Sequence, residues 1–271
     1  MPTIAYPTLV TRGGDLKGRA LPADTRIRLV RMSDPGAFTD AATPHLFGLV
    51  IATAGLAKTR ALLNRLLLSS PDLHLVVVLR EDASHGDVEA VAKPRIRVCR
   101  ASAAPSVLLR ALRHTWFDGR REAIRRIART RRIPVVVQCA VSQILDQRVP
   151  MSIPESGDAG LVRTLGRLAT LCGTHRDTLR RASHRSGVDL RALMRTSIVA
   201  LALHERFVVA DPPRSTPWAR IARRCGYDGA AGLRALVARE FGVGFRDLDL
   251  DDLQQALDRL GHGVAGDGTP A

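Results

Sequence analysis

The N-terminal part of the chain alternates between short apolar runs and longer segments with helical spacing. Four of the runs are rich in β-branched or apolar residues and have the length of strands: 26–32, 46–53, 73–80 and 95–100. Between them, 56–69 repeats apolar residues on one face of a helix until Pro71 interrupts the pattern, and 84–92 predicts a further helix. Strands that alternate with helices predict a small, mostly parallel α/β sheet.

From Pro105 onward the strand pattern gives way to helical periodicity. Residues 105–132 predict one long basic helix, with Gly119 as a candidate break, and Pro134 opens the next helix. The stretch 148–160 is typical of a loop, and the pattern from there to about 260 is helical.

These patterns divide the chain of 271 residues into four parts, with the main boundary between 103 and 133. The hydrophobic fraction of 45% and the charged fraction of 25% are those of a folded protein rather than a disordered one. We expect an α/β sensory or dimerisation domain at 1–103, a basic connecting helix at 104–133, an all-α domain at 134–260 and a flexible tail at 261–271.

The sequence lacks the usual signals of membrane insertion, secretion, metal binding and catalysis. No apolar run approaches the roughly 20 residues of a membrane span, and the N-terminus has no basic-then-apolar signal pattern, so we expect a cytoplasmic protein. The wide spacing of the cysteines argues against a zinc module or a disulfide framework and favours buried thiols. We find no catalytic triad or paired carboxylates, and therefore expect no enzyme activity, metal or cofactor. The cysteines are Cys99, Cys139, Cys172 and Cys225.

Positive charge is concentrated in part of the chain. Lys and Arg number 41 against 26 Asp and Glu, a net charge of +15. Residues 104–150 contain 10 Arg and 3 acids, residues 160–246 contain 16 Arg and 6 acids, and the segment from 247 onward is acidic. This distribution favours a polyanion as partner over an ordinary solvated surface.

Residues 161–187 have the pattern of two short helices joined by a tight turn. Leu165, Leu168 and Ala169 form one face of the first helix, which runs to Cys172, and Gly173 supplies the turn. Thr174 and Asp177 resemble a capping box at the start of the second helix, whose core-facing residue is Leu179. The polar residues around Leu179 are candidates for contact with a groove: His175, Arg176, Arg180, Arg181, His184 and Arg185. For the two histidines, exposed positions without contact are an equal alternative.

The same plan returns at 215–242. Ser215 or Thr216 is expected to cap a helix whose first residue is Pro217, and Gly226 is expected to make the turn before a cap at Asp228. The inward positions of this second unit are Ile221, Ala222, Leu233, Leu236 and Val237. Between the units, 188–209 predicts a long helix that can hold the two units at a fixed separation.

The two units together resemble the AraC/XylS family of transcription regulators. The family signature is matched by Ile221, Ala222, Gly226, Tyr227, Leu233 and Gly242, and in the first unit by Leu168, Ala169, Leu179, Arg181 and Gly187. The resemblance covers about 134–246. It implies a sequence-specific regulator that places two helix-turn-helix units in successive major grooves of double-stranded DNA.

The chain departs from the family pattern mainly in its second unit. Gly229 and Ala231 stand where the family usually has serines, and Ala235 stands where an arginine is common. In the first unit, Ser183 lies near an apolar position. We therefore expect the first unit to read bases and the second to position the protein, with Arg223, Arg224, Arg234 and Arg239 as phosphate contacts.

The N-terminal alternation of strands and helices resembles the receiver domain of response regulators. The resemblance implies an acceptor Asp at the end of an internal strand, but 49–51 runs into Ala52, and Asp34 is the only acid near a strand end on that side. Arg80 and Arg100 replace the expected threonine and lysine. We therefore expect no phosphorylation by that route, and predict a degenerate receiver-like module that dimerises or senses a partner.

Three alternatives to a sequence-specific, homodimeric regulator stay open. The first is a sequence-indifferent nucleic-acid binder, and the second is a degenerate regulator that acts through protein contacts, for which RNA polymerase is a candidate partner. The third is a small-molecule enzyme built on the α/β half, which would need a catalytic cleft. The basic helix at 105–132 is expected to join two subunits or to contact flanking phosphates.

Overall fold

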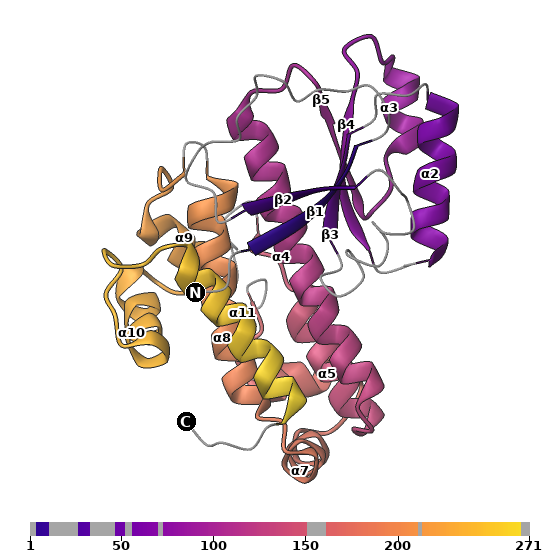
Figure 1. Ribbon diagram of the computed structural model, residues 1–271. Helices are drawn as coiled ribbons and strands as arrows, with labels where there is room; N and C mark the ends of the chain where they lie inside the picture. Colours follow the sequence, from indigo (N-terminus) through magenta and orange to yellow (C-terminus); the bar gives the residue numbers. More distant parts are fainter. Residues whose placement is uncertain are drawn as a thin grey trace. The chain divides into compact units, whose positions relative to one another are not determined.

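The computed structural model describes residues 4–10, 27–32, 47–51, 56–69, 73–150, 161–210 and 213–266. It divides into two compact units, Met1–Ala123 and Ile124–Ala271. The helix α4 (Pro105–Thr130) runs through the division. The described chain is mostly helical, with a small parallel sheet in its N-terminal part and helices after it, as the sequence predicts (Figure 1).

The described strands of the first unit form one parallel sheet. Its strand order is β2-β1-β3-β4-β5, and every neighbouring pair is parallel. The elements before α4 are β1 (Ile4–Val10), β2 (Ile27–Met32), β3 (Phe47–Ile51), α2 (Leu56–Ser69), β4 (His74–Leu79), α3 (His85–Val91) and β5 (Ile96–Arg100).

The strand β1 is absent from the sequence prediction although it lies inside the sheet. Its central Pro7 has no N–H to donate, which argues against an internal strand. The register explains why Pro7 is tolerated, because β3 pairs with β1 only from Thr8 onward while Pro7 lies opposite Val30 of β2. Pro7 therefore has a partner strand on one side only in this register.

The described core of the first unit lies on both faces of β4. Leu75, Val77 and Leu79 of that strand pack with Leu63 and Leu66 of α2. The alternate strand residues, Val76 and Val78, are buried as well. Figure 1 shows α2 and α3 on the same side of the sheet. A strand buried on both faces reads as a continuous apolar run, which is why 73–80 is recognisable in the sequence.

The helix α4 is continuous through Gly119. Its 26 residues include Leu112, Trp116 and Phe117, which are all buried. The position of Gly119 is also buried. A glycine inside a helix costs only about 1 kcal/mol relative to alanine, so burial of its neighbours is enough to keep the helix unbroken. The candidate break at Gly119 is therefore wrong.

The second unit is helical throughout its described secondary structure. After the last residues of α4, its elements are α5 (Val135–Asp146), α6 (Leu165–Leu171), α7 (Arg176–Ser186), α8 (Leu190–His204), the π-helical segment η2 (Glu205–Val209), α9 (Trp218–Arg224), α10 (Ala230–Phe241) and α11 (Leu250–Ala265). The expected flexible tail from residue 261 is wrong for 261–265, because α11 continues there. Residues 267–271, and 151–160 of the expected loop, lie outside the described residues.

The helix α8 is the centre of the second unit. From Leu193 to His204 its residues are buried apart from Arg195, and it packs against α5, α10 and α11. Polar groups on it find partners inside the unit, since Ser197 Oγ donates to the carbonyl oxygen of Ile144 at 3.3 Å. A helix that is apolar on all sides must be covered on all sides, so α8 fixes where its neighbours lie.

The helix α11 covers α8 with a regular apolar face. Leu253, Leu257 and Leu260 are at most 1% exposed. The helix begins with a capping box in which Asp249 accepts from the N–H groups of Asp251 and Asp252, and the Asp252 carboxylate accepts from the Asp249 N–H at 2.8 Å. Two of the acidic residues that make the segment from 247 onward negative, Asp249 and Asp252, therefore form the N-terminal cap of α11.

We predict that Leu257→Ala destabilises the second unit by about 2–5 kcal/mol, because it leaves a cavity between α11 and its neighbours. Val135→Ala, at a side chain that is 78% exposed, is the matched control and should change stability by about 0.5 kcal/mol or less. Denaturant unfolding followed by fluorescence measures both, in a Trp116→Phe background that leaves Trp218 of the second unit as the reporter. Equal stabilities of the two variants would contradict this packing.

Candidate nucleic-acid interface

The helices α6 and α7 form a helix-turn-helix pair around a small apolar contact. Leu168, Ala169 and Leu179 are at most 2% exposed, so the inner face predicted from the sequence is confirmed. Gly173 between the helices has φ +61°, a left-handed conformation that glycine adopts without strain. Thr164 caps α6 by accepting from the N–H of Arg167 at 3.3 Å.

The cap of α7 differs from the sequence prediction. The N-cap residue is His175, whose Nδ1 accepts from the Asp177 N–H at 3.3 Å. The predicted capping box of Thr174 with Asp177 is therefore wrong by one residue. His175 is 77% exposed, so its ring lies at the surface next to the positive end of the helix dipole.

The outward face of α7 is strongly basic. Its exposed residues include Arg176, Arg180, Arg181, His184 and Arg185, all of them candidates from the sequence. The nearby acid is Asp177, whose carboxylate is 3.8 Å from Arg180 Nε, and the Asp177 carbonyl accepts from Arg181 Nε at 3.3 Å. Such exposed contacts contribute little, so they do not hold the guanidinium groups back from a polyanion.

The helices α9 and α10 repeat this arrangement. Ile221, Ala222 and Leu233 are fully buried, and Gly226 in the turn has φ +84°. The predicted inner face and turn are confirmed, Leu236 and Val237 being buried as well.

The predicted caps of the second pair are wrong. Pro217 is the N-cap residue of α9 and Gly229 that of α10, and neither helix has a side-chain cap. The helices therefore begin at Trp218 and Ala230, so neither Ser215, Thr216 nor Asp228 caps them.

The outward face of α10 is formed largely by small residues. Ala231, Gly232, Ala235 and Ala238 are exposed, with Arg234 and Arg239 beside them. Gly232 is required by a close approach, because a Cβ there would lie 2.7 Å from Cδ1 of the Tyr227 ring. The face thus presents little polar chemistry apart from its two arginines.

The neighbours Arg223 and Arg224 have opposite environments. Arg223 is exposed, whereas Arg224 is 7% exposed and its Nη1 lies 2.8 Å from Glu205 Oε2. Arg224 Nε also donates to the carbonyl oxygen of Pro150. The expectation that Arg224 contacts phosphate is therefore wrong: its guanidinium is used inside the protein.

Ring contacts contribute a feature that the sequence does not reveal. The Arg163 guanidinium lies 5.0 Å from the centroid of the Tyr227 ring, which joins the segment before α6 to the second helix pair. Trp218 and Phe245 stack with their centroids 4.2 Å apart, and Arg206 and Arg234 lie over the two rings. These residues are far apart in the sequence, and no local pattern signals their contacts.

The cysteines are free thiols. Cys99 and Cys225 are buried as predicted, whereas Cys139 of α5 and Cys172 at the end of α6 are half-buried and contact one another. Burial, followed by the hydrogen bond with the Cys139 thiol, raises the pKa of Cys172 to about 12. Burial likewise raises the pKa of Cys225 to about 12. Both groups are therefore thiols and not thiolates at neutral pH.

The described residues hold no group of three or more His, Cys, Asp or Glu that could bind a metal ion. Within the same residues, no helix combines the length and the apolarity needed to cross a bilayer. Comparisons of the chain with models of protein families, with curated proteins and with solved structures found no match.

We predict that Arg224→Ala destabilises the second unit by about 3–5 kcal/mol, because Glu205 is left buried without its partner. Arg223→Ala is the matched control one residue away and should change stability by about 0.5 kcal/mol or less. Denaturant unfolding of the two variants measures the difference. Equal losses would contradict the buried ion pair.

The loss in Arg224→Ala should depend on pH. Burial raises the pKa of Glu205 above its ordinary value of 4.5, and Arg224 opposes this shift. Without Arg224 the carboxyl takes up a proton in the folded state, so its stabilising contribution is present below 4.5 and is lost as pH rises through the folded pKa. The variant should therefore lose less stability near pH 4.5 than near pH 8.

Proposed function

We propose that this chain is a sequence-specific regulator of transcription that binds double-stranded DNA through two helix-turn-helix units. The observation that carries the proposal is the outward face of α7, where five basic residues are exposed on a helix whose other side is packed. A helix of this kind fits the major groove of B-DNA, which is wide enough to admit it.

The order of elements in the second unit supports the resemblance to the AraC/XylS family. Two helix pairs of the same plan, each with a left-handed glycine in its turn, flank the buried helix α8. The first pair packs on α5, which itself packs on α8, and α10 of the second pair packs on α8 directly. Both pairs are therefore packed on connected helices of one unit, as binding to two successive grooves requires.

The two pairs have different roles in this proposal. On α7, Arg176 and Arg180 are suited to guanine edges, which accept two hydrogen bonds from one guanidinium. On the second pair, Arg223, Arg234 and Arg239 are exposed next to a face of alanine and glycine. They suit phosphates, which fix the position of the protein on the duplex but carry no base sequence.

The first unit is proposed to act as a receiver-like module for dimerisation or for sensing a partner. The parallel order β2-β1-β3-β4-β5 is the order of flavodoxin-like folds, to which receiver domains belong, and supports this part of the proposal. The strand β3 ends at Ile51, and Arg80 and Arg100 stand at the ends of β4 and β5. These residues do not supply the acceptor chemistry of phosphorylation.

A second candidate is a nucleic-acid binder without sequence preference. The small outward residues of α10 favour it, because phosphate contacts alone give affinity that depends on salt and not on sequence.

The deciding experiment is selection of bound sequences from a random duplex library near physiological salt. We expect an enriched motif with most of its information in one half-site, and a weaker half-site about one helical turn away. Equal information in both half-sites would contradict the division of roles. Binding without enrichment would favour the second candidate, and no binding would overturn both and leave a role in protein–protein contacts.

We predict that Arg180→Ala weakens binding to the selected sequence by about 1–3 kcal/mol and relaxes the preference at one base pair. Arg239→Ala should instead weaken binding to selected and random duplexes by the same factor and lower the salt dependence of binding. Titrations of both duplexes at several salt concentrations distinguish the two effects. The same pattern in both variants would contradict the separate roles of α7 and α10.

We further propose that the regulator is a homodimer. The part of α4 in the second unit exposes the apolar side chain of Ile127, which a second copy would cover. Light scattering after size exclusion should give twice the mass of 29.4 kDa. A monomer at working concentration would overturn this part of the proposal.

A further inference from the structure

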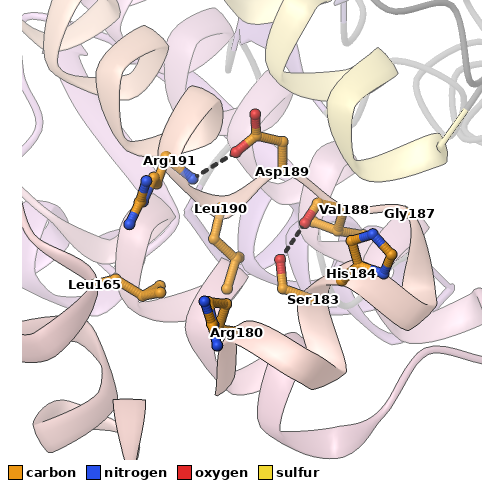
Figure 2. Close-up of a pocket in the computed structure, with 9 residues that line it drawn as sticks. All are labelled: Leu165, Arg180, Ser183, His184, Gly187, Val188, Asp189, Leu190 and Arg191. Atoms are coloured by element: carbon orange, nitrogen blue, oxygen red, sulfur yellow. Dashed lines mark hydrogen bonds between the residues drawn. The ribbon is translucent and has the colours of Figure 1, made fainter. Parts of the chain in front are cut away.

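A cavity of about 600 Å³ lies at the corner where α7 passes into α8. Its inner residues are Leu165, Val188 and Leu190, which are at most 7% exposed. Its rim carries Arg180, His184 and Arg191, which are exposed. Figure 2 shows these side chains coming from α6, α7, the corner at Val188 and the first turn of α8. The cavity therefore combines an apolar interior with a basic entrance.

Ser183 contributes a small polar side chain to the lining of the cavity. This residue lies one helical turn after the buried Leu179, on the side of α7 that lines the cavity. Its hydroxyl donates to the carbonyl oxygen of Val188, so the side chain is held against the backbone (Figure 2). A large apolar side chain at this place would take up part of the space.

The corner that frames the cavity is well ordered by local interactions. Gly187 ends α7 in a left-handed conformation, with φ +68°. Asp189 then caps α8, and one of its carboxylate oxygens accepts from the N–H groups of Arg191 and Ala192 at 2.9 and 3.0 Å. The Asp189 carboxylate keeps its negative charge in this role, and the two guanidinium groups of Arg180 and Arg191 outnumber it at the entrance.

The size and chemistry of the cavity define the class of ligand. Its volume is within the range of roughly 300–1,000 Å³ that is typical of small-molecule sites. Two guanidinium groups at the entrance favour a carboxylate, sulfonate or phosphate, and the inner leucines and valine favour an apolar body. The corresponding ligand is a small organic anion with an aromatic or aliphatic part.

We propose that this cavity is an effector site for a small organic anion with an apolar body, and that the effector competes with DNA for Arg180. The competition rests on the proposed function, because it assigns Arg180 to both the cavity and the base-reading face of α7. The assignment of the cavity itself rests only on its lining. Since linkage is reciprocal, an effector that weakens DNA binding must itself be bound more weakly in the presence of DNA.

The first test uses 8-anilinonaphthalene-1-sulfonate, an aromatic sulfonate that fluoresces in apolar sites, with the full chain and no DNA. We expect saturable binding to the wild type. Ser183→Phe, which narrows the cavity, and Arg191→Gln, which removes a charge at the exposed entrance, should each weaken binding by about tenfold or more. Leu68→Ala, at an exposed leucine of the first unit, is the control and should bind like the wild type.

Equal binding by the wild type and both cavity variants would overturn the proposal. Because Arg191 is exposed, Arg191→Gln keeps the test decisive even where Ser183→Phe perturbs folding, which circular dichroism detects.

The second test measures affinity for the selected duplex with and without the sulfonate. We expect the sulfonate to weaken DNA binding by the wild type, and to have no such effect on Ser183→Phe. Sulfonate binding in the cavity without DNA binding of any kind would overturn the proposed function and leave the cavity assignment standing. DNA binding that the sulfonate leaves unchanged would overturn the competition, even with the cavity occupied.

Discussion

Between Leu193 and His204, α8 exposes almost none of its surface, and this constraint organises the C-terminal unit. A buried helix of this length needs neighbours on every side, and α5, α10 and α11 are those neighbours. Burial of a leucine or isoleucine side chain contributes about 1.5–3 kcal/mol to stability. The burial of α8 therefore stabilises the unit more than any single surface contact does. The second pair is held on α8 directly through α10, and the first pair is held through α5, which itself packs on α8.

This arrangement separates the side chains that stabilise the fold from those that are available to a partner. In each pair one short apolar contact, around Leu179 or Leu233, is enough for packing, and the remaining faces are open to solvent. On the second pair part of the charge is used internally. Glu240 lies 2.8 Å from Arg195 of α8 and 3.7 Å from Arg239, whereas on α7 the half-exposed Asp177 lies 3.8 Å from Arg180. The positive potential is therefore expected to be stronger over α7.

The sequence predicted the helix pairs well because their signals are local. Gly173 and Gly226 mark turns that require a left-handed residue, and the apolar spacing around Leu179 and Leu233 marks the inner faces. Cap positions were less reliable, as His175 shows, because several neighbouring residues can accept the same N–H groups.

Long-range partners were not predictable from the sequence. Arg224 lies three residues after Ile221, on the inner side of α9, but only the fold brings Glu205 to it. In the same way Pro7 argues against a strand until the pairing of β1 with β2 and β3 is known. These misses have one physical cause, which is that a side chain's role depends on what approaches it from elsewhere in the chain.

Ser183 illustrates how a departure from a family pattern acquires meaning only in three dimensions. From the sequence, a serine near an apolar position is a local inconsistency that lowers the packing of the first pair. In the structure the same serine leaves space that Leu165, Val188 and Leu190 line from within and that Arg180 borders. The Ser183 hydroxyl donates to the carbonyl oxygen of Val188, a bond that an apolar residue at this position would not make. The proposed effector would occupy this space beside Arg180, and would act on the outward face of α7 through that residue.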